Sequence, residues 1–91
     1  MNIKEIVESQ NCEDNSVKLS VFLTADVLKE DMELLAIGRT LIYSEDFPLP
    51  YFKIITPEYT MRGALGTDRI TIDFNSTDAE GCRKKILPLF E

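Results

Sequence analysis

KIITPEYTMRGALGTDRITIDF, residues 53–74, contains two apolar runs separated by a segment rich in turn formers. The runs, at 52–55 and 69–74, are bounded by polar residues, and the second alternates apolar and polar residues. This pattern predicts two core strands. The segment between them, 57–67, holds one proline and two glycines, which predicts a long exposed connection. Connections of this length in a small domain are usually functional or disordered.

Working outward, the remaining segments predict a mixture of strands and helices. The clearest is a helix at 25–37, which Thr24 can cap at its start and Gly38 can close in a left-handed conformation. The other predicted elements are a short amphipathic helix at 2–10, strands at 17–24, 39–44, 51–56 and 68–74, a break at 45–50, and an edge strand at 82–87. The predicted fold class is α+β, with one main helix packed on a small mixed sheet of four to five strands.

Length and composition predict a single domain spanning residues 1–91. The chain is 44% hydrophobic and 29% charged, which is typical of an ordinary globular domain. Its net charge is −6, and residues 1–50 carry ten acids against four bases. This acidity argues against a nucleic-acid partner, since binding a phosphate backbone requires a basic surface.

Membrane and export signals are not apparent in the sequence. No apolar run approaches the length of a membrane span. The N-terminus, MNIKEIVESQ, has acidic residues where a signal peptide needs a positive start and an apolar core. We therefore expect a cytoplasmic protein that does not bind membranes, and the sequence leaves its oligomeric state open.

The residues for common catalytic and metal chemistry are largely absent. Histidine is missing, which removes the usual general base and most zinc sites. Neighbouring acids such as Glu45 and Asp46 point apart on a helix or strand, so they predict no acid–base pair. Cys12 and Cys82 match no CxxC spacing; in an oxidising compartment they could form a disulfide, but we expect a surface thiol and a packed thiol, both reduced. The sequence therefore predicts a protein that is not an enzyme and has no metal or cofactor.

The segment 57–67 supplies the first candidate binding site. Aromatic, methionine and arginine side chains are enriched in protein interfaces, and rigidly mounted loops often serve recognition. An alternative left open is a plain connection whose Met61 and Leu65 pack back onto the domain. The residues of the predicted exposed binding loop, within 58–66, are Tyr59, Thr60, Met61, Arg62, Gly63, Ala64 and Leu65.

Several short motifs in 34–86 follow one another in an order seen in a known family. They are Gly38, then FKIITP at 52–57, then DRITI at 68–72, then the turn and last run at 81–86. In this order they resemble the potato inhibitor I group of serine protease inhibitors and its I78-type relatives.

The resemblance implies a non-enzymatic protease inhibitor acting through the loop at 58–66. It also implies that Arg69 supports the loop from the strand below. The family braces its loop with an acid after the cleavage residue, whereas this chain has Arg62 after Thr60 and Met61.

The uneven charge supports a second functional hypothesis from a different class. A small acidic effector or adaptor could bind a basic partner protein through its acidic N-terminal half. The predicted helix carries the acids that would form this face, Glu30, Asp31 and Glu33. Both hypotheses describe a small protein-binding domain, and they differ in the surface and the charge of the partner.

Overall fold

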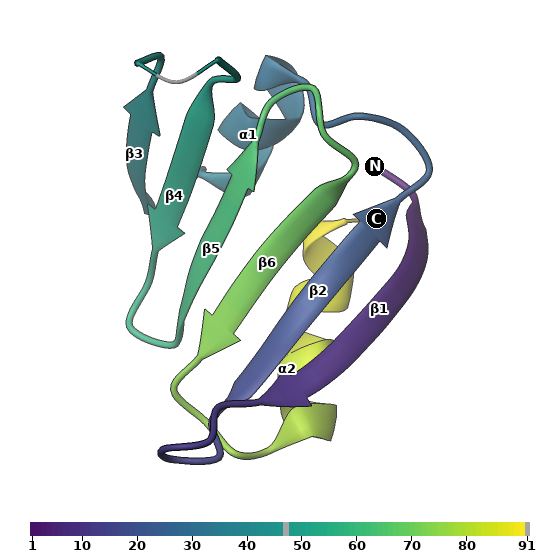
Figure 1. The fold of residues 1–91 in the computed structure, drawn as a ribbon, viewed down its shortest axis with the longest axis vertical. Helices are drawn as coiled ribbons and strands as arrows, with labels where there is room; N and C mark the ends of the chain where they lie inside the picture. Colours follow the sequence, from purple (N-terminus) through teal and green to yellow (C-terminus); the bar gives the residue numbers. More distant parts are fainter. Residues whose placement is uncertain (47, 91) are drawn as a thin grey trace.

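The computed structural model describes residues 1–46 and 48–90, so Phe47 and Glu91 lie outside it. Six strands form one antiparallel sheet in the order β1-β2-β6-β5-β4-β3 (Figure 1). The strands are β1 Ile3–Gln10, β2 Val17–Leu23, β3 Thr40–Ser44, β4 Tyr51–Ile55, β5 Tyr59–Ala64 and β6 Arg69–Phe74. The helices are α1 Lys29–Leu35, α2 Ala79–Ile86 and the 3₁₀ turn η1 Leu87–Leu89.

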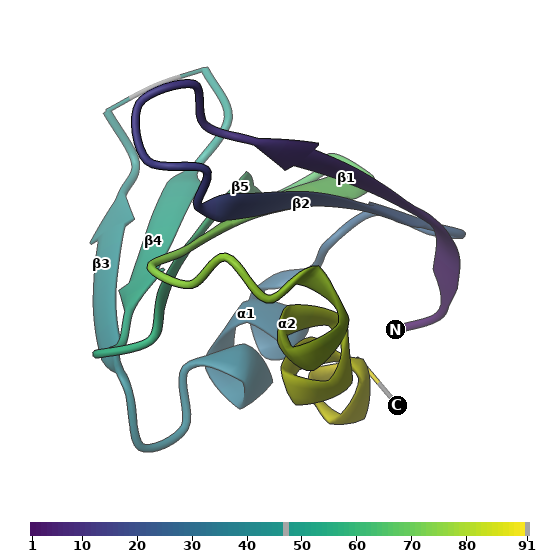
Figure 2. The ribbon, with the colours of Figure 1, turned by 90° about the horizontal axis from the view of Figure 1, so that it is seen from below.

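Both helices lie on the same face of the curved sheet, and the opposite face is open (Figure 2). The helix α1 has only seven residues, and α2 has eight before it continues into η1. The expected fold of one main helix on four to five mixed strands is therefore wrong. The protein is β-rich, and its antiparallel sheet of six strands contributes most of the core.

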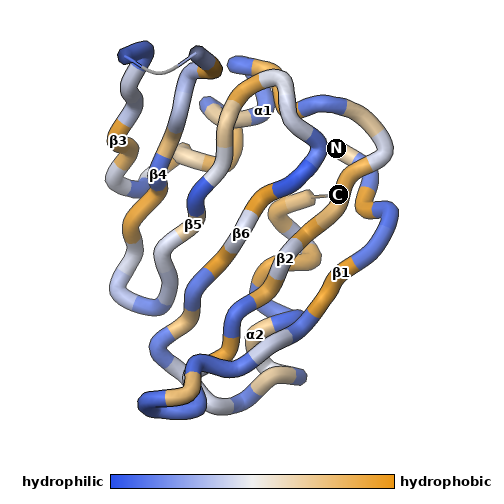
Figure 3. The backbone as a smooth tube through the Cα atoms, viewed as in Figure 1, coloured by the Kyte–Doolittle hydropathy of each residue, from blue (hydrophilic) through white to orange (hydrophobic). Residues whose placement is uncertain are grey.

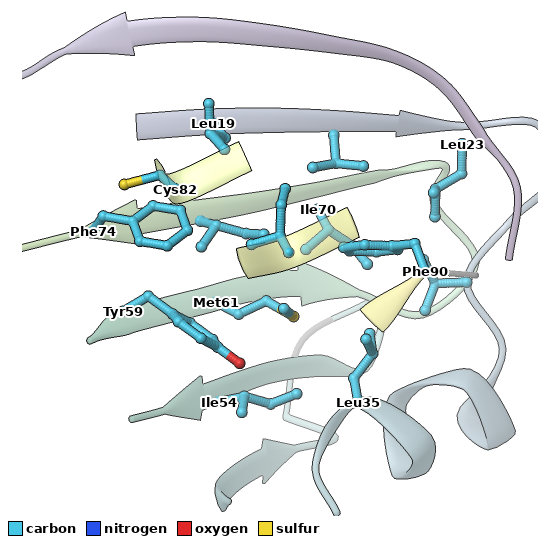
Figure 4. Close-up of a cluster of buried hydrophobic side chains, with 14 of the residues drawn as sticks. Leu19, Leu23, Leu35, Ile54, Tyr59, Met61, Ile70, Phe74, Cys82 and Phe90 are labelled. Carbon is cyan, nitrogen blue, oxygen red and sulfur yellow. The ribbon is translucent and has the colours of Figure 1, made fainter. Parts of the chain in front are cut away.

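The core lies between the sheet and the helices and follows from alternation along the strands. In β2 every second residue is buried, and β6 shows the same period. Hydrophobic and hydrophilic residues alternate along β6 (Figure 3). Side chains from β2, β4, β5 and β6 meet those of both helices there (Figure 4). Because successive strand residues point to opposite faces, each of these four strands gives about half of its side chains to this core. The predicted strands at 17–24, 39–44, 51–56 and 68–74 are confirmed to within one residue as β2, β3, β4 and β6.

The predicted helix at 2–10 is wrong, because these residues form the edge strand β1. The register of β1 against β2 shifts between Ile3 and Glu5. This irregularity places Ile3 and Ile6 on the same face, opposite the buried Leu23 and Val21. A bulge adds one residue to β1, so Ile3 and Ile6 share a face although they are three residues apart. A spacing of three between apolar residues is also typical of a helix.

The predicted helix at 25–37 is shorter than expected at both ends, and its N-cap is Leu28 and not Thr24. The Val27 backbone N–H donates to the Thr67 carbonyl at 2.7 Å, and the Val27 carbonyl accepts from the Gly66 N–H at 2.9 Å. With both groups bonded to the β5–β6 connection, Val27 cannot join a helix, and α1 begins only at Lys29. The predicted left-handed conformation of Gly38 is confirmed by its φ of 71°, but α1 ends at Leu35 with Ala36 as its C-cap, so Gly38 lies in the turn beyond the helix end.

The predicted edge strand at 82–87 is also wrong, because this segment lies in the helix α2 and the turn η1. The Asp78 carboxylate caps α2 by accepting from the Gly81 backbone N–H at 3.1 Å. Cys82 and Ile86, four residues apart, are both buried against the sheet. That spacing is helical, and the bases that suggested an edge strand lie on the outer side of α2. The predicted break at 45–50 falls between β3 and β4.

Candidate functional site

The predicted binding loop is a strand in the interior of the sheet. Tyr59–Ala64 forms β5, which is bonded to β4 on one side and to β6 on the other (Figure 1). Met61 lies opposite Ile54 in β4 and opposite Ile72 in β6. The expectation of an exposed loop at 58–66 is therefore wrong.

The turn that replaces the loop is short and is held by one threonine. The Thr56 hydroxyl oxygen accepts from the backbone N–H groups of Glu58 and Tyr59 at 3.2 and 3.0 Å. The Thr56 backbone N–H donates to the Tyr59 carbonyl at 2.9 Å. A Thr side chain can close a turn in this way without a glycine. The chain thus reverses around Pro57 within a few residues and starts a new strand at once.

The residues of the predicted loop divide between the two faces of the sheet. Tyr59 and Met61 are 9% and 0% exposed and point into the core (Figure 4). Gly63 faces the same way, and a Cβ there would lie 2.7 Å from the Phe52 ring. The residues on the open face are Thr60, Arg62 and Ala64. Leu65 follows the strand and packs against the core from the β5–β6 connection.

Arg62 and Arg69 belong to a basic group on the open face, which we call the basic face. It consists of Lys18, Lys53, Arg62 and Arg69, from β2, β4, β5 and β6. Arg62 forms an ion pair with Asp73, and the guanidinium of Arg69 lies 5.9 Å from the centre of the Phe22 ring.

A shallow hollow of about 500 Å³ lies on this face and is lined by three of these bases and by Tyr51. Sequence reasoning missed the basic face because its members are far apart in the chain. Their positions on the polar side of alternating strands were a signal of a shared face, but the strand order was needed to bring them together.

A second surface forms where three connections meet at one end of the sheet (Figure 1). They join β2 to α1, β3 to β4, and β5 to β6, and their described residues are 24–28, 45–46 with 48–50, and 65–68. The Leu65 N–H donates to the Pro50 carbonyl at 2.8 Å, which joins the β5–β6 connection to the β3–β4 connection. The hydrogen bonds of Val27 with Gly66 and Thr67 join the β2–α1 connection to the β5–β6 connection. These backbone bonds hold the three connections together, so their side chains form one surface.

This surface, which we call the acidic end, combines carboxylates with exposed leucines. None of the three connections contains a lysine or an arginine. Leu28 and Leu49 are 56% and 48% exposed there. Beside Leu49 is an apolar hollow of about 460 Å³, which Tyr51 and Ala64 also line. The acids of the acidic end are Asp26, Glu45, Asp46 and Asp68, with Glu30 and Asp31 in the first turn of α1.

The three acids predicted from the helix do not have equal roles. The Asp31 carboxylate accepts from the Leu28 backbone N–H at 3.0 Å and so stabilises the start of α1. Glu30 and Glu33 are exposed. Leu34 and Ile37, which follow them, are 64% and 67% exposed. The outer side of α1 thus continues the mixture of acid and aliphatic side chains found at the acidic end.

A further hollow is a cleft of about 590 Å³ between the start of β3, the β4–β5 turn and α2. Arg39, Lys85 and Tyr59 line it, and the Tyr59 hydroxyl is buried without a hydrogen-bond partner in the described structure. A hydrogen bond and ion pair with Glu58 raise the pKa of Lys85.

In the described part of the chain, potential metal ligands and cysteines show no shared site. The residues that the structure describes contain no group of three or more His, Cys, Asp or Glu side chains placed to hold a metal ion. Cys12 is exposed and Cys82 is buried, and both are free thiols. Burial raises the pKa of the Cys82 thiol, which makes its reactive thiolate scarce.

Among the described residues, neither α1 nor α2 nor any other helix is long and apolar enough to cross a membrane. Comparisons with family models, with curated proteins and with solved structures found no match to this chain.

Proposed function

We propose that the protein is a small non-enzymatic binding domain that recognises a basic partner protein through the acidic end. The observation that carries this proposal is the backbone bonding of three connections, which gathers exposed carboxylates around exposed leucines. The backbone hydrogen bonds of Leu65 and Val27 hold this surface in place, so binding costs little conformational entropy. The inhibitor hypothesis lacks such support, because its reactive loop lies inside the sheet.

The chemistry of the acidic end suits a protein partner better than a simple counter-ion. Exposed acids steer a basic surface toward it and align the encounter. Leu28, Leu49 and the apolar hollow next to Tyr51 then provide area that binding can remove from water. Charged rims around apolar centres are typical of protein interfaces.

Reversal of the acidic end tests the proposal. The bait is the protein with Asp26→Lys, Glu30→Lys and Asp68→Lys combined, and it is compared with wild type in affinity purification from a native lysate. We expect proteins with basic surfaces to be enriched by wild type and lost from the reversed bait. Their retention on wild type should fall as salt is raised, because exposed charges are screened.

A matched control separates this site from net charge. The combination Glu5→Lys, Glu13→Lys and Glu80→Lys reverses the same number of exposed acids outside the acidic end. It should keep the partners that wild type enriches. If the two triple variants lose or keep the same partners, the acidic end is not the binding site.

The basic face is a second candidate, with an acidic partner protein. It is favoured by the hollow of about 500 Å³, which three of its four bases line, in a chain whose net charge is −6. Lys18→Glu combined with Arg69→Glu would then remove partners that the reversed acidic end retains. Partners unaffected by Lys18→Glu and Arg69→Glu would exclude this surface.

A further inference from the structure

The strand β3 is an exposed edge of the sheet. It is the last strand in the order and pairs with β4 alone. Within the described part of the chain, no backbone hydrogen bond reaches its outer side. An edge of this kind presents unpaired N–H and C=O groups that a further strand can meet.

The two edges of the sheet differ in their protection. The edge strand β1 contains Lys4, Glu5 and Glu8, and its register is interrupted after Ile3. Charges and bulges are the usual means by which proteins prevent edge-to-edge pairing. The residues of β3, TLIYS, include no charge and no proline. The β3 edge is thus open to pairing, whereas the β1 edge is not.

We propose that two copies of the chain associate through β3, antiparallel and about a two-fold axis at Ile42. In this register Ile42 lies opposite Ile42 of the second copy, Leu41 opposite Tyr43, and Thr40 opposite Ser44. All five residues of the strand are then paired. The two sheets become one continuous sheet, with the helices of both copies on the same side.

Charges at the two ends of β3 complement one another in this register. Arg39 immediately precedes the strand and Glu45 immediately follows it, and both are exposed. With Ile42 on the axis, Arg39 of each copy lies opposite Glu45 of the other, which gives two symmetric ion pairs. A shift of the axis to Leu41 or Tyr43 shortens the ladder and separates these charges, so the charges select one register.

Apolar side chains add contact on the open face. Ile42 is 49% exposed although it lies in a strand. Pairing about Ile42 places the two isoleucines side by side, and cross-strand aliphatic pairs of this kind stabilise sheets. On the other face Leu41 meets Tyr43, whose ring already lies 5.9 Å from the Lys29 ammonium of α1.

Sedimentation equilibrium on the full chain tests the dimer with a charge exchange. Wild type should show a monomer–dimer equilibrium at physiological salt. Arg39→Glu and Glu45→Arg each place like charges opposite one another at two positions, so each alone should weaken dimerisation by about tenfold or more, equivalent to about 1.4 kcal/mol. An equimolar mixture of the two variants should associate about as well as wild type, because every facing pair is then opposite in sign.

The restoration in the mixture is the decisive result, since association through another surface has no reason to show it. Lys84→Glu, on the exposed side of α2, serves as a control and should leave the equilibrium unchanged. Arg39 also donates to the Leu35 and Ile37 carbonyls, so circular dichroism must show that Arg39→Glu still folds.

Should Arg39→Glu fail to fold, loss of the dimer in both Glu45→Arg and Ile42→Lys carries the test. A monomeric wild type at every concentration would overturn the proposal. So would a dimer that is equally stable in both single variants and in their mixture.

Discussion

Replacing Met61 with alanine distinguishes the interior strand from an exposed loop. Met61 is fully buried and lies between Ile54 and Ile72 on its two neighbouring strands. Truncation removes its apolar contacts and leaves a cavity that the flanking strands cannot easily fill. We expect a loss of about 3–5 kcal/mol, in the upper part of the usual range for buried Met→Ala changes.

That loss would be a large part of the protein's stability. A chain of this length is typically stable by roughly 5–14 kcal/mol. The melting temperature should therefore fall by about 12 °C or more, given the usual response of domains of this size. Met61→Ala has been chosen over a polar change because it adds no unsatisfied group, so its effect measures packing alone.

Urea denaturation followed by circular dichroism measures the change directly. Thr60→Ala is the matched control, since Thr60 is the neighbouring residue but points to the open face. It should lower the free energy of unfolding by about 1 kcal/mol at most. Equal and small effects of both substitutions would refute the interior strand and would return residues 58–66 to an exposed loop.

Gly63→Ala places a Cβ 2.7 Å from the Phe52 ring, so it should lower the free energy of unfolding by about 1–3 kcal/mol, and Phe52→Leu in the same chain should recover part of that loss. A thiol reagent should modify Cys12 in the folded protein and Cys82 only after denaturation; equal rates would contradict the burial of Cys82. The Ser16 N–H holds the pKa of Asp14 below 3.8, so its contribution to stability should be present above pH 3.8 and lost as pH falls through the folded pKa; an NMR titration at or above 3.8 would contradict this hydrogen bond.

The strands β2 and β6 could be predicted from the sequence because apolar residues recur at every second position along each of them. In 17–24 and 68–74 every second residue is apolar, and these segments became β2 and β6. The same period is present in β5, where Tyr59 and Met61 face the core. This alternation was not recognised because Pro57, Gly63 and Gly66 are residue types typical of turns, and they predicted a loop. Gly63 is tolerated inside a strand because the Phe52 ring occupies the space of its missing side chain.

The other differences arise from tertiary contacts that no local pattern contains. The bulge in β1 changes the spacing of its apolar residues from two to three. The hydrogen bonds of Val27 with Gly66 and Thr67 move the start of α1 to a later residue, Lys29. For the same reason neither the basic face nor the acidic end could be predicted from the sequence. The bases of the basic face are neighbours only in the strand order, and the acidic end depends on backbone bonds between three connections.

The strand order also determines how the chain can fold. Four of the strand pairs described join consecutive strands, whereas β2 pairs with β6 across the whole of α1, β3, β4 and β5. Closing so long a loop is entropically costly before its contacts form, which slows folding. We expect refolding in milliseconds to seconds, with the amides of Ile54 and Met61 protected from hydrogen exchange before those of Leu19 and Val21. Until that last pairing closes, β6 is a second open edge, so the nascent chain is most prone to aggregation at this stage.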